Sequence, residues 1–147
     1  LGESELQSGN EDKAKEAFNR LRQEYPDYEF TPAAVEGLAF IAEKNEDYET
    51  AIQTYKDVTN KWADSFAARR QNLNIARCEE KRGNFEEALK SYQAHIEVFP
   101  GSSVATDAPE ALDKLKSAHP ELFTEKESST KPDATPVSAT ESDAAGE

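Results

Sequence analysis

A segment with the pattern of an amphipathic helix occurs three times in this chain of 147 residues, at intervals of 37 residues. The copies cover residues 9–26, 46–63 and 83–100 and align without a gap. The columns of matched chemistry are Gly9/Glu46/Gly83, Asn10/Asp47/Asn84, Ala14/Ala51/Ala88, Phe18/Tyr55/Tyr92, Leu21/Val58/His95 and Pro26/Ala63/Pro100. Because chance does not hold one register over six such columns, the chain is predicted to be a repeat protein.

Each column has a physical role in a pair of helices joined by a tight turn. The first two columns form the turn, where glycine tolerates a positive φ. The alanine column lets neighbouring helices approach closely. The aromatic residue four positions later lies on the same helix face and fills the space between repeats. Proline ends the helix because it cannot continue the ladder of hydrogen bonds.

A partner helix is expected upstream of each turn. In residues 31–47, Thr31 is the expected N-cap and Pro32 the first helical residue. In the next copy, Ser65 or Asp64 takes the capping role. The repeating unit is therefore a helix–turn–helix. The repeats are expected at about residues 1–26, 27–63 and 64–100.

The two ends differ from the repeats. Upstream of the first turn about two helical turns remain, where later copies have about four, so we expect a fragment or a processed form of a longer protein. A helix at about residues 107–118 would cover the last repeat, with Leu112 and Leu115 as apolar contacts. Residues 124–147 contain one valine, no aromatic residue, and six acidic against two basic residues. This composition predicts a disordered acidic tail after a domain that spans residues 1–123.

The composition argues against several classes of function. The net charge of −13 repels phosphate backbones, so no nucleic-acid partner is expected. No run of about 18 apolar residues exists, so no direct membrane span is expected. A single cysteine, Cys78, and two histidines form neither an internal disulfide nor a metal site. No set of acid, base and nucleophile stands out either, and we expect no enzyme, no metal and no cofactor.

The repeated columns resemble the tetratricopeptide repeat. Its Leu-Gly positions in the first helix fall at Leu1-Gly2, Leu38-Ala39 and Ile75-Ala76. Its turn residues, second-helix alanine, aromatic residue and proline match the columns given above. The resemblance covers about residues 1–118. It implies an all-α, right-handed α-solenoid of antiparallel helix pairs, with about three repeats, a C-terminal capping helix and a disordered tail.

The period is three residues longer than the standard repeat of about 34 residues. The extra residues fall in the link after Pro26, in the stretch "PDYEFTPAA". This longer form is similar to the repeats of bacterial cell-envelope proteins, such as the Tol–Pal-associated protein and the lipoprotein of the β-barrel assembly machine. That similarity implies the periplasm or cell envelope as the compartment; without it, the cytoplasm is expected.

The resemblance also implies a binding groove lined by the first helix of each repeat. The candidate protein-binding residues are Glu36, Phe40, Glu43, Arg70, Leu73, Arg77 and Lys81. Three of these, Arg70, Arg77 and Lys81, lie on one helix face. One interpretation is capture of a carboxylate or an acidic peptide, because arginine binds carboxylates in a bidentate fork. The other is a solvated face on which Glu80 and nearby acids compensate the positive charges.

Several single residues have two interpretations. The clamp with which chaperone-binding repeats hold a C-terminal carboxylate is not expected, because Gly37 and Asn74 stand at its positions. Phe40 is either an exposed anchor in the groove or packed under a neighbouring helix. Trp62 is predicted to pack between repeats and Cys78 to be buried and unreactive. His95 is predicted to be partly buried.

Two functions are compatible with these features. The first is a non-catalytic scaffold that binds a partner peptide or protein in the groove, as part of a larger, envelope-type assembly. The alternative is a structural or oligomerisation module with an idle groove, which self-associates through the shortened first repeat around Leu6, Ala14 and Ala17.

Overall fold

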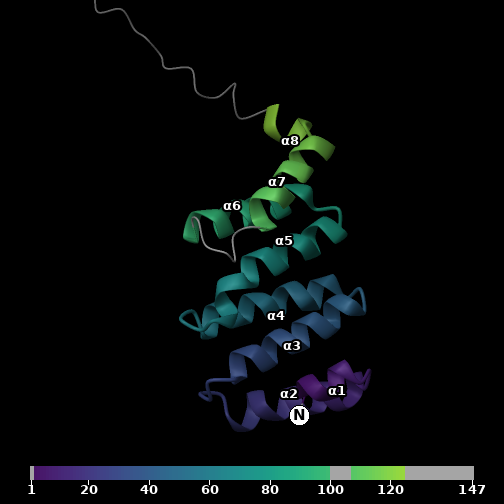
Figure 1. Ribbon diagram of the computed structural model, residues 1–147, viewed down its shortest axis with the longest axis vertical. Coiled ribbons are helices and arrows are strands. Elements are labelled where there is room, and N and C mark those ends of the chain that lie inside the picture. Colours follow the sequence, from purple (N-terminus) through teal and green to yellow (C-terminus); the bar gives the residue numbers. More distant parts are fainter. Residues whose placement is uncertain (1, 100–106, 125–147) are drawn as a thin grey trace, which may run out of the picture.

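The structure is a stack of antiparallel helix pairs (Figure 1). This computed structural model describes residues 2–99 and 107–124. The helices are α1 (Gly2–Gln7), α2 (Glu11–Glu24), α3 (Thr31–Lys44), α4 (Tyr48–Lys61), the 3₁₀ helix η1 (Ala67–Arg70), α5 (Gln71–Lys81), α6 (Phe85–Val98), α7 (Asp107–Ala118) and α8 (Glu121–Thr124). These ranges contain no strand. The predicted all-α solenoid is confirmed, and α7 is the predicted capping helix. The predicted disordered tail lies, from residue 125 onward, outside the described residues.

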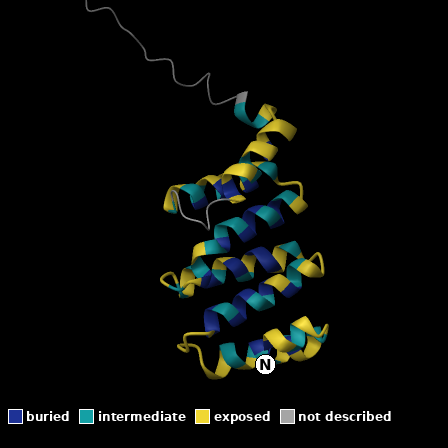
Figure 2. Cartoon of the chain, in the orientation of Figure 1, coloured by how far each residue is buried: buried dark blue, intermediate teal, exposed yellow. Residues whose placement is uncertain are grey.

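Packing in this stack is local. Each helix from α1 to α7 packs mainly against the helix before it and the helix after it. The buried side chains therefore form a series of small clusters rather than one central core. Figure 2 shows the buried positions along the faces where neighbouring helices meet. This arrangement is typical of a solenoid. None of the described helices is long and apolar enough to cross a membrane.

The turn column has the predicted backbone conformation in all three copies. Gly9 and Gly83 have φ values of 81° and 79°, and Glu46, at the same position of the second repeat, has a φ of 61°. The left-handed region is open to glycine at little cost, while a side chain there is strained. The second repeat therefore forms the same turn with a less favourable residue.

Two helix starts differ from the prediction. The N-cap of α3 is Phe30, and Thr31 is already a buried residue of the first turn. Its hydroxyl donates to the carbonyl oxygen of Tyr25 at 2.5 Å, so it ties the helix to the preceding link instead of capping it. The helix of the third repeat begins as 3₁₀ turns in η1. The N-cap of η1 is Phe66, and Ser65, the predicted cap, lies one residue earlier, where its hydroxyl accepts from the Ala68 N–H at 3.1 Å.

Candidate protein-binding groove

The first helices of successive repeats line a hollow of about 360 Å³. Its lining residues are Glu3 and Leu6 of α1; Ala33, Glu36, Gly37 and Phe40 of α3; Arg70, Asn74 and Arg77 of η1 and α5; and Phe18 and Tyr55 of the second helices. Four of the predicted groove residues, Glu36, Phe40, Arg70 and Arg77, are thereby brought together. We call this hollow the groove.

The remaining predicted groove residues lie beside or away from it. Glu43 contacts Arg77 at the edge of the groove. Leu73 is partly buried and packs against the cluster between α5, α6 and α7. Lys81 is exposed at the end of α5 and does not line the groove. The lining of the groove thus extends from the first repeat, across α3 of the second repeat, to the third repeat.

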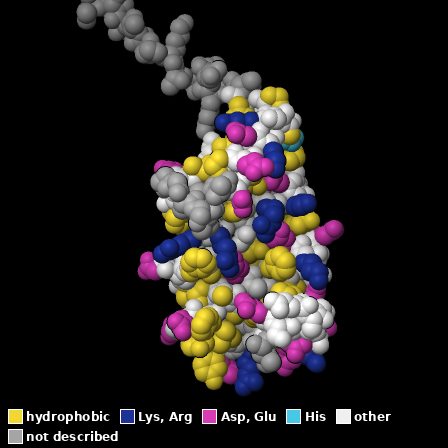
Figure 3. Space-filling view, in the orientation of Figure 1, with side chains coloured by type: hydrophobic (Ala, Val, Ile, Leu, Met, Phe, Trp, Pro, Cys, Tyr) yellow, Lys and Arg dark blue, Asp and Glu magenta, His cyan; other side chains and the backbone are white. Residues whose placement is uncertain are grey.

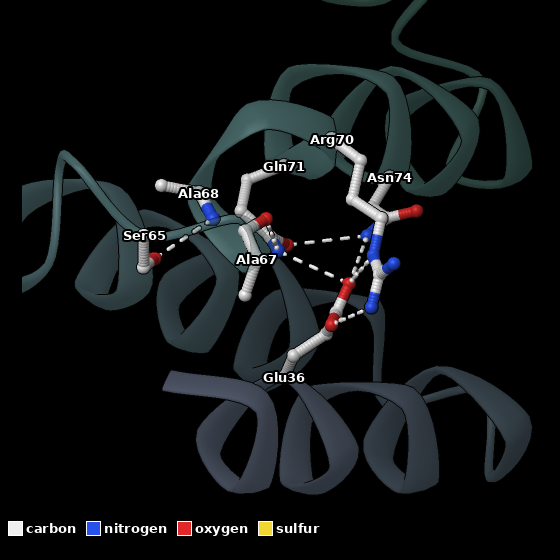
Figure 4. A network of polar contacts seen from close by, with 7 residues as sticks. All are labelled: Glu36, Ser65, Ala67, Ala68, Arg70, Gln71 and Asn74. Carbon is white, nitrogen blue, oxygen red and sulfur yellow. Dashed lines mark hydrogen bonds and ion pairs between the residues drawn. The ribbon is translucent and has the colours of Figure 1, made fainter. Parts of the chain in front are cut away.

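One side of the groove is a network around the buried carboxylate of Glu36 (Figure 4). Arg70 donates to both carboxylate oxygens through Nε and Nη2. Gln71 Nε2 and Asn74 Nδ2 donate to Oε1 at 3.1 Å and 3.3 Å. Gln71 Nε2 also donates to the Ala67 carbonyl at 2.6 Å. Because every donor to Glu36 comes from the following repeat, the network fixes η1 and α5 against α3.

A second network lies two turns further along the same helices. Arg77 donates to Glu43 through Nε at 2.6 Å and Nη2 at 2.7 Å, and the Tyr55 hydroxyl donates to Glu43 at 2.9 Å. Burial opposes ionisation of Glu43, but the hydrogen bonds and charge of Arg77, with the Tyr55 hydroxyl, outweigh it and lower the Glu43 pKa. Burial and the adjacent carboxylate raise the pKa of Tyr55. Glu43 is therefore charged and Tyr55 neutral near pH 7.

The positive stripe predicted from Arg70 and Arg77 is thus neutralised by glutamates of α3. The acid that pairs with Arg77 is Glu43, while Glu80, the acid named for this role from the sequence, accepts from the Tyr92 hydroxyl at 2.5 Å. Both arginine side chains remain 42% exposed. Each uses Nε and Nη2 for its glutamate, and Nη1 makes no hydrogen bond within the described residues. The Nη1 groups therefore keep hydrogen-bond donors that are unused within the described residues.

The other side of the groove is apolar. Phe40 is 47% exposed, so of its two interpretations the exposed position in the groove is the correct one. Leu6 and Phe18 lie beside it in the lining. These three residues stand 37 positions before Glu43, Tyr55 and Arg77. The groove therefore joins an apolar part at α1 and α3 to a part with neutralised charges at α3 and α5.

Three residues discussed from the sequence lie outside the groove. Trp62 donates from Nε1 to the Pro26 carbonyl at 3.1 Å and packs against Val35 and Val58, which places it between repeats as predicted. Cys78 is buried, and desolvation raises the pKa of its thiol to about 12. His95 is fully buried, deeper than predicted. The equivalent residue one repeat earlier is Val58, which is buried in the packing between repeats, so this position faces the interior in both repeats.

The partners of the two arginines, and the part that Gln71 takes in the Glu36 network, were not predicted from the sequence. A signal was present, because Glu36–Arg70 and Glu43–Arg77 are both 34 residues apart and each pair joins successive repeats. Alignment at the 37-residue period compares equivalent positions and does not reveal contacts between positions that differ.

Comparison with known proteins agrees with this architecture. Models of the tetratricopeptide repeat match residues 1–28 and residues 42–103. No curated protein sequence gives a significant match to the chain.

Proposed function

Because the chain is a tetratricopeptide repeat protein, a class that serves in general as a scaffold for protein–protein interaction, we propose that it binds a segment of a protein partner in the groove. The observation that carries this proposal is the exposed ring of Phe40 in a hollow lined by three successive repeats. Exposed aromatic side chains in concave, partly apolar sites are typical anchors of protein interfaces.

The groove chemistry defines the kind of segment that fits. An apolar side chain of the partner would pack against Phe40 and Leu6. A carboxylate or carbonyl oxygen would accept from the Nη1 groups of Arg70 and Arg77. Because both arginines are already paired with glutamates, a carboxylate gains less here than at an unpaired arginine. The apolar contact therefore supplies most of the affinity, and the acidic group adds to it.

Selection of peptides from a random display library on the purified chain tests this function. Selected peptides should bind the Phe40→Ala variant at least about tenfold more weakly, the loss of about 1.4 kcal/mol expected when one anchor is truncated. Val98→Ala is the matched control, since Val98 is an exposed apolar residue of α6 that does not line the groove. Replacing a peptide carboxylate by its amide should have a smaller effect than Phe40→Ala. Peptides that bind Phe40→Ala and the unaltered chain equally well would exclude the groove as the binding site.

The proposal has a finer part, which concerns the assembly. The 37-residue period and the long links between repeats support a place among the repeat proteins of bacterial cell-envelope assemblies. The partner would then be an envelope protein. Fractionation of cells that produce the tagged protein from its complete gene tests this part, and recovery of the protein solely in the cytoplasm would refute it.

The alternative function, an oligomerisation module with an idle groove, is favoured by one observation. Three aromatic residues of the α2–α3 link, Tyr25, Tyr28 and Phe30, are each half or more exposed. Light scattering of the purified chain distinguishes the two functions, because an oligomerisation module would form a concentration-dependent dimer or larger species.

A further inference from the structure

An exposed phenylalanine stands beside the groove at its link end. Phe66, in the link between α4 and α5, is 67% exposed. The guanidinium carbon of Arg70 lies 5.7 Å from the centroid of the Phe66 ring. Figure 3 shows hydrophobic side chains beside Lys and Arg side chains at the left edge of the stack, the edge along which the α2–α3 and α4–α5 links run in Figure 1. Because Arg70 lines the groove, the ring of Phe66 extends the surface of the groove toward the link.

Folding does not account for a phenylalanine at this position. Phe66 is the N-cap of η1, a position that favours Ser, Thr, Asp and Asn because their side chains accept from the free N–H groups of the helix. Its ring belongs to none of the clusters of buried hydrophobic side chains in the described ranges. The equivalent residue of the preceding link, 37 positions earlier, is the exposed Glu29. The repeat therefore forms without an aromatic side chain here.

The exposed ring of Phe40 lies on the other side of the Glu36–Arg70 ion pair. Phe40 stands four residues after Glu36 in α3, about 6 Å further along the helix axis. Arg70 binds Glu36 and lies against the ring of Phe66, so the order along this surface is Phe66, the ion pair, Phe40. With about 4 Å across the ion pair, the two rings are on the order of 15 Å apart.

This spacing fits an extended chain with two side chains four residues apart. An extended chain rises about 3.3 Å per residue, so four residues span about 13 Å, and positions i, i+2 and i+4 point to the same side. The side chain at i+2 then faces Arg70, whose Nη1 has no hydrogen bond within the described residues. A helical segment would place positions i and i+4 only about 6 Å apart and would reach one of the two rings.

We propose that Phe66 is a second anchor of the groove, and that the ligand is an extended segment of a protein partner with apolar side chains at positions i and i+4 and a carboxylate at i+2. The inference rests on the proposed function, because the first anchor is Phe40. The two apolar side chains cover the exposed rings, and the carboxylate accepts from Arg70 Nη1. Anchors on both sides of the ion pair fix the register of the bound segment, which Phe40 alone does not.

Two fluorescent peptides of equal composition test the spacing. Leu-Ser-Asp-Ser-Leu-Ser-Ser has its leucines four residues apart, while Leu-Ser-Asp-Leu-Ser-Ser-Ser has them three apart, on opposite sides of an extended chain. We expect the first peptide to bind the full chain with a saturable change in anisotropy, and the second to bind at least about tenfold more weakly, since it reaches one anchor. Alanine in place of the aspartate of the first peptide should weaken binding by about two- to threefold, because Arg70 is already paired with Glu36.

Variants of the chain locate the second anchor. Phe66→Ser should weaken binding of the first peptide at least about tenfold, whereas Phe66→Tyr, which keeps a ring, should stay within about threefold of the unaltered chain. Serine is a preferred N-cap residue and Phe66 is exposed, so the helical circular dichroism should not change. Val98→Ala, the matched control, removes an exposed apolar side chain that does not line the groove and should alter binding less than about twofold.

Several results would overturn the inference. They are equal binding of the two peptides, equal binding of the first peptide to the unaltered chain and to Phe66→Ser, and no saturable binding of that peptide at millimolar concentration. Equal binding after the aspartate is replaced would remove the carboxylate from the ligand. None of these results contradicts the groove proposal, which stands as long as the peptides selected from the random library depend on Phe40. Binding that Phe66→Ser weakens but Phe40→Ala leaves unchanged would instead place a separate site at the link and refute the two-anchor ligand.

Discussion

Replacing Gly37 by alanine tests the packing between the first two repeats. The ring of Phe18 lies between two glycines: a Cβ on Gly37 would lie 2.7 Å from its Cε2, and a Cβ on Gly2 would lie closer still to its Cε1. Both distances are shorter than any real Cβ contact. Because the ring is buried and has a glycine against each edge, a new methyl group at position 37 requires the ring to shift.

Two opposing effects determine the magnitude of this change. Overpacking a confined core side chain costs about 1–3 kcal/mol. Alanine in place of glycine within a helix contributes about 1 kcal/mol of stabilisation. The net loss of stability for Gly37→Ala is therefore about 1 kcal/mol, within a range of about 0–2 kcal/mol. In a Phe18→Leu background the clash is relieved and only the gain in helix propensity remains, so the same substitution should stabilise by about 1 kcal/mol.

Urea unfolding of the four proteins of this cycle, followed by Trp62 fluorescence, measures the effect. The expected sign reversal corresponds to a coupling energy of about 1–3 kcal/mol between positions 18 and 37. A Gly37→Ala change that stabilises equally in both backgrounds would refute the packing argument. An asparagine at position 37, the residue of the carboxylate clamp, would place its Cβ against the same ring.

Further predictions concern the second network, the buried thiol and the turns. Glu43→Gln should destabilise the chain by about 1–2 kcal/mol at pH 7, a value reduced because Arg77 is partly exposed. Since folding lowers the Glu43 pKa, this loss should shrink in urea titrations as pH falls below about 4.5, where the unaltered chain loses the same contribution. Cys78 should react with a disulfide reagent at pH 8 at least about tenfold more slowly in the folded chain than in urea. Burial raises the pKa of this thiol from 9.0 to about 12, so between these pH values the thiol ionises in the unfolded chain but not in the folded one. The chain should therefore lose stability over this pH range, and the Cys78→Ala variant should lose less. Glu46→Gly should raise the melting temperature through relief of about 0.5–1 kcal/mol of backbone strain, whereas Gly83→Ala, in the same column, should lower it.

The period of the sequence predicted the helices, the turns and the capping helix because these depend on equivalent positions in each repeat. The turn column shows this clearly, since Glu46 adopts the conformation of Gly9 and Gly83. The details of the helix starts were predicted less well. Thr31 has the chemistry of an N-cap, but its hydroxyl donates to the Tyr25 carbonyl in the long link. A tertiary contact of this kind has no local pattern in the sequence.

In the groove, too, the sequence predicted which residue types lie on the first helices but not which of them contact one another. From the residue types alone, Arg70, Arg77 and Lys81 were expected to form a positive stripe on one helix face. Their net effect depends on which charges meet, and both arginines proved to be paired across the interface.

Three positions that meet at each interface show how a repeat interface changes its chemistry. The second interface has Glu43, Tyr55 and Arg77 in contact, and the equivalent residues of the first are Leu6, Phe18 and Phe40. Within the second set the polar groups pair with one another, and the first set is apolar throughout. A single exchange between them would leave a carboxylate or a guanidinium facing apolar groups, at a cost of several kcal/mol when the charge is buried. The three positions therefore have to change together, and the loss of the Tyr55 hydroxyl at Phe18 is the expected companion of the loss of the glutamate at Leu6. This joint change leaves Phe40 without a polar partner on the surface of the groove, where an apolar side chain of a partner is the group that can cover it.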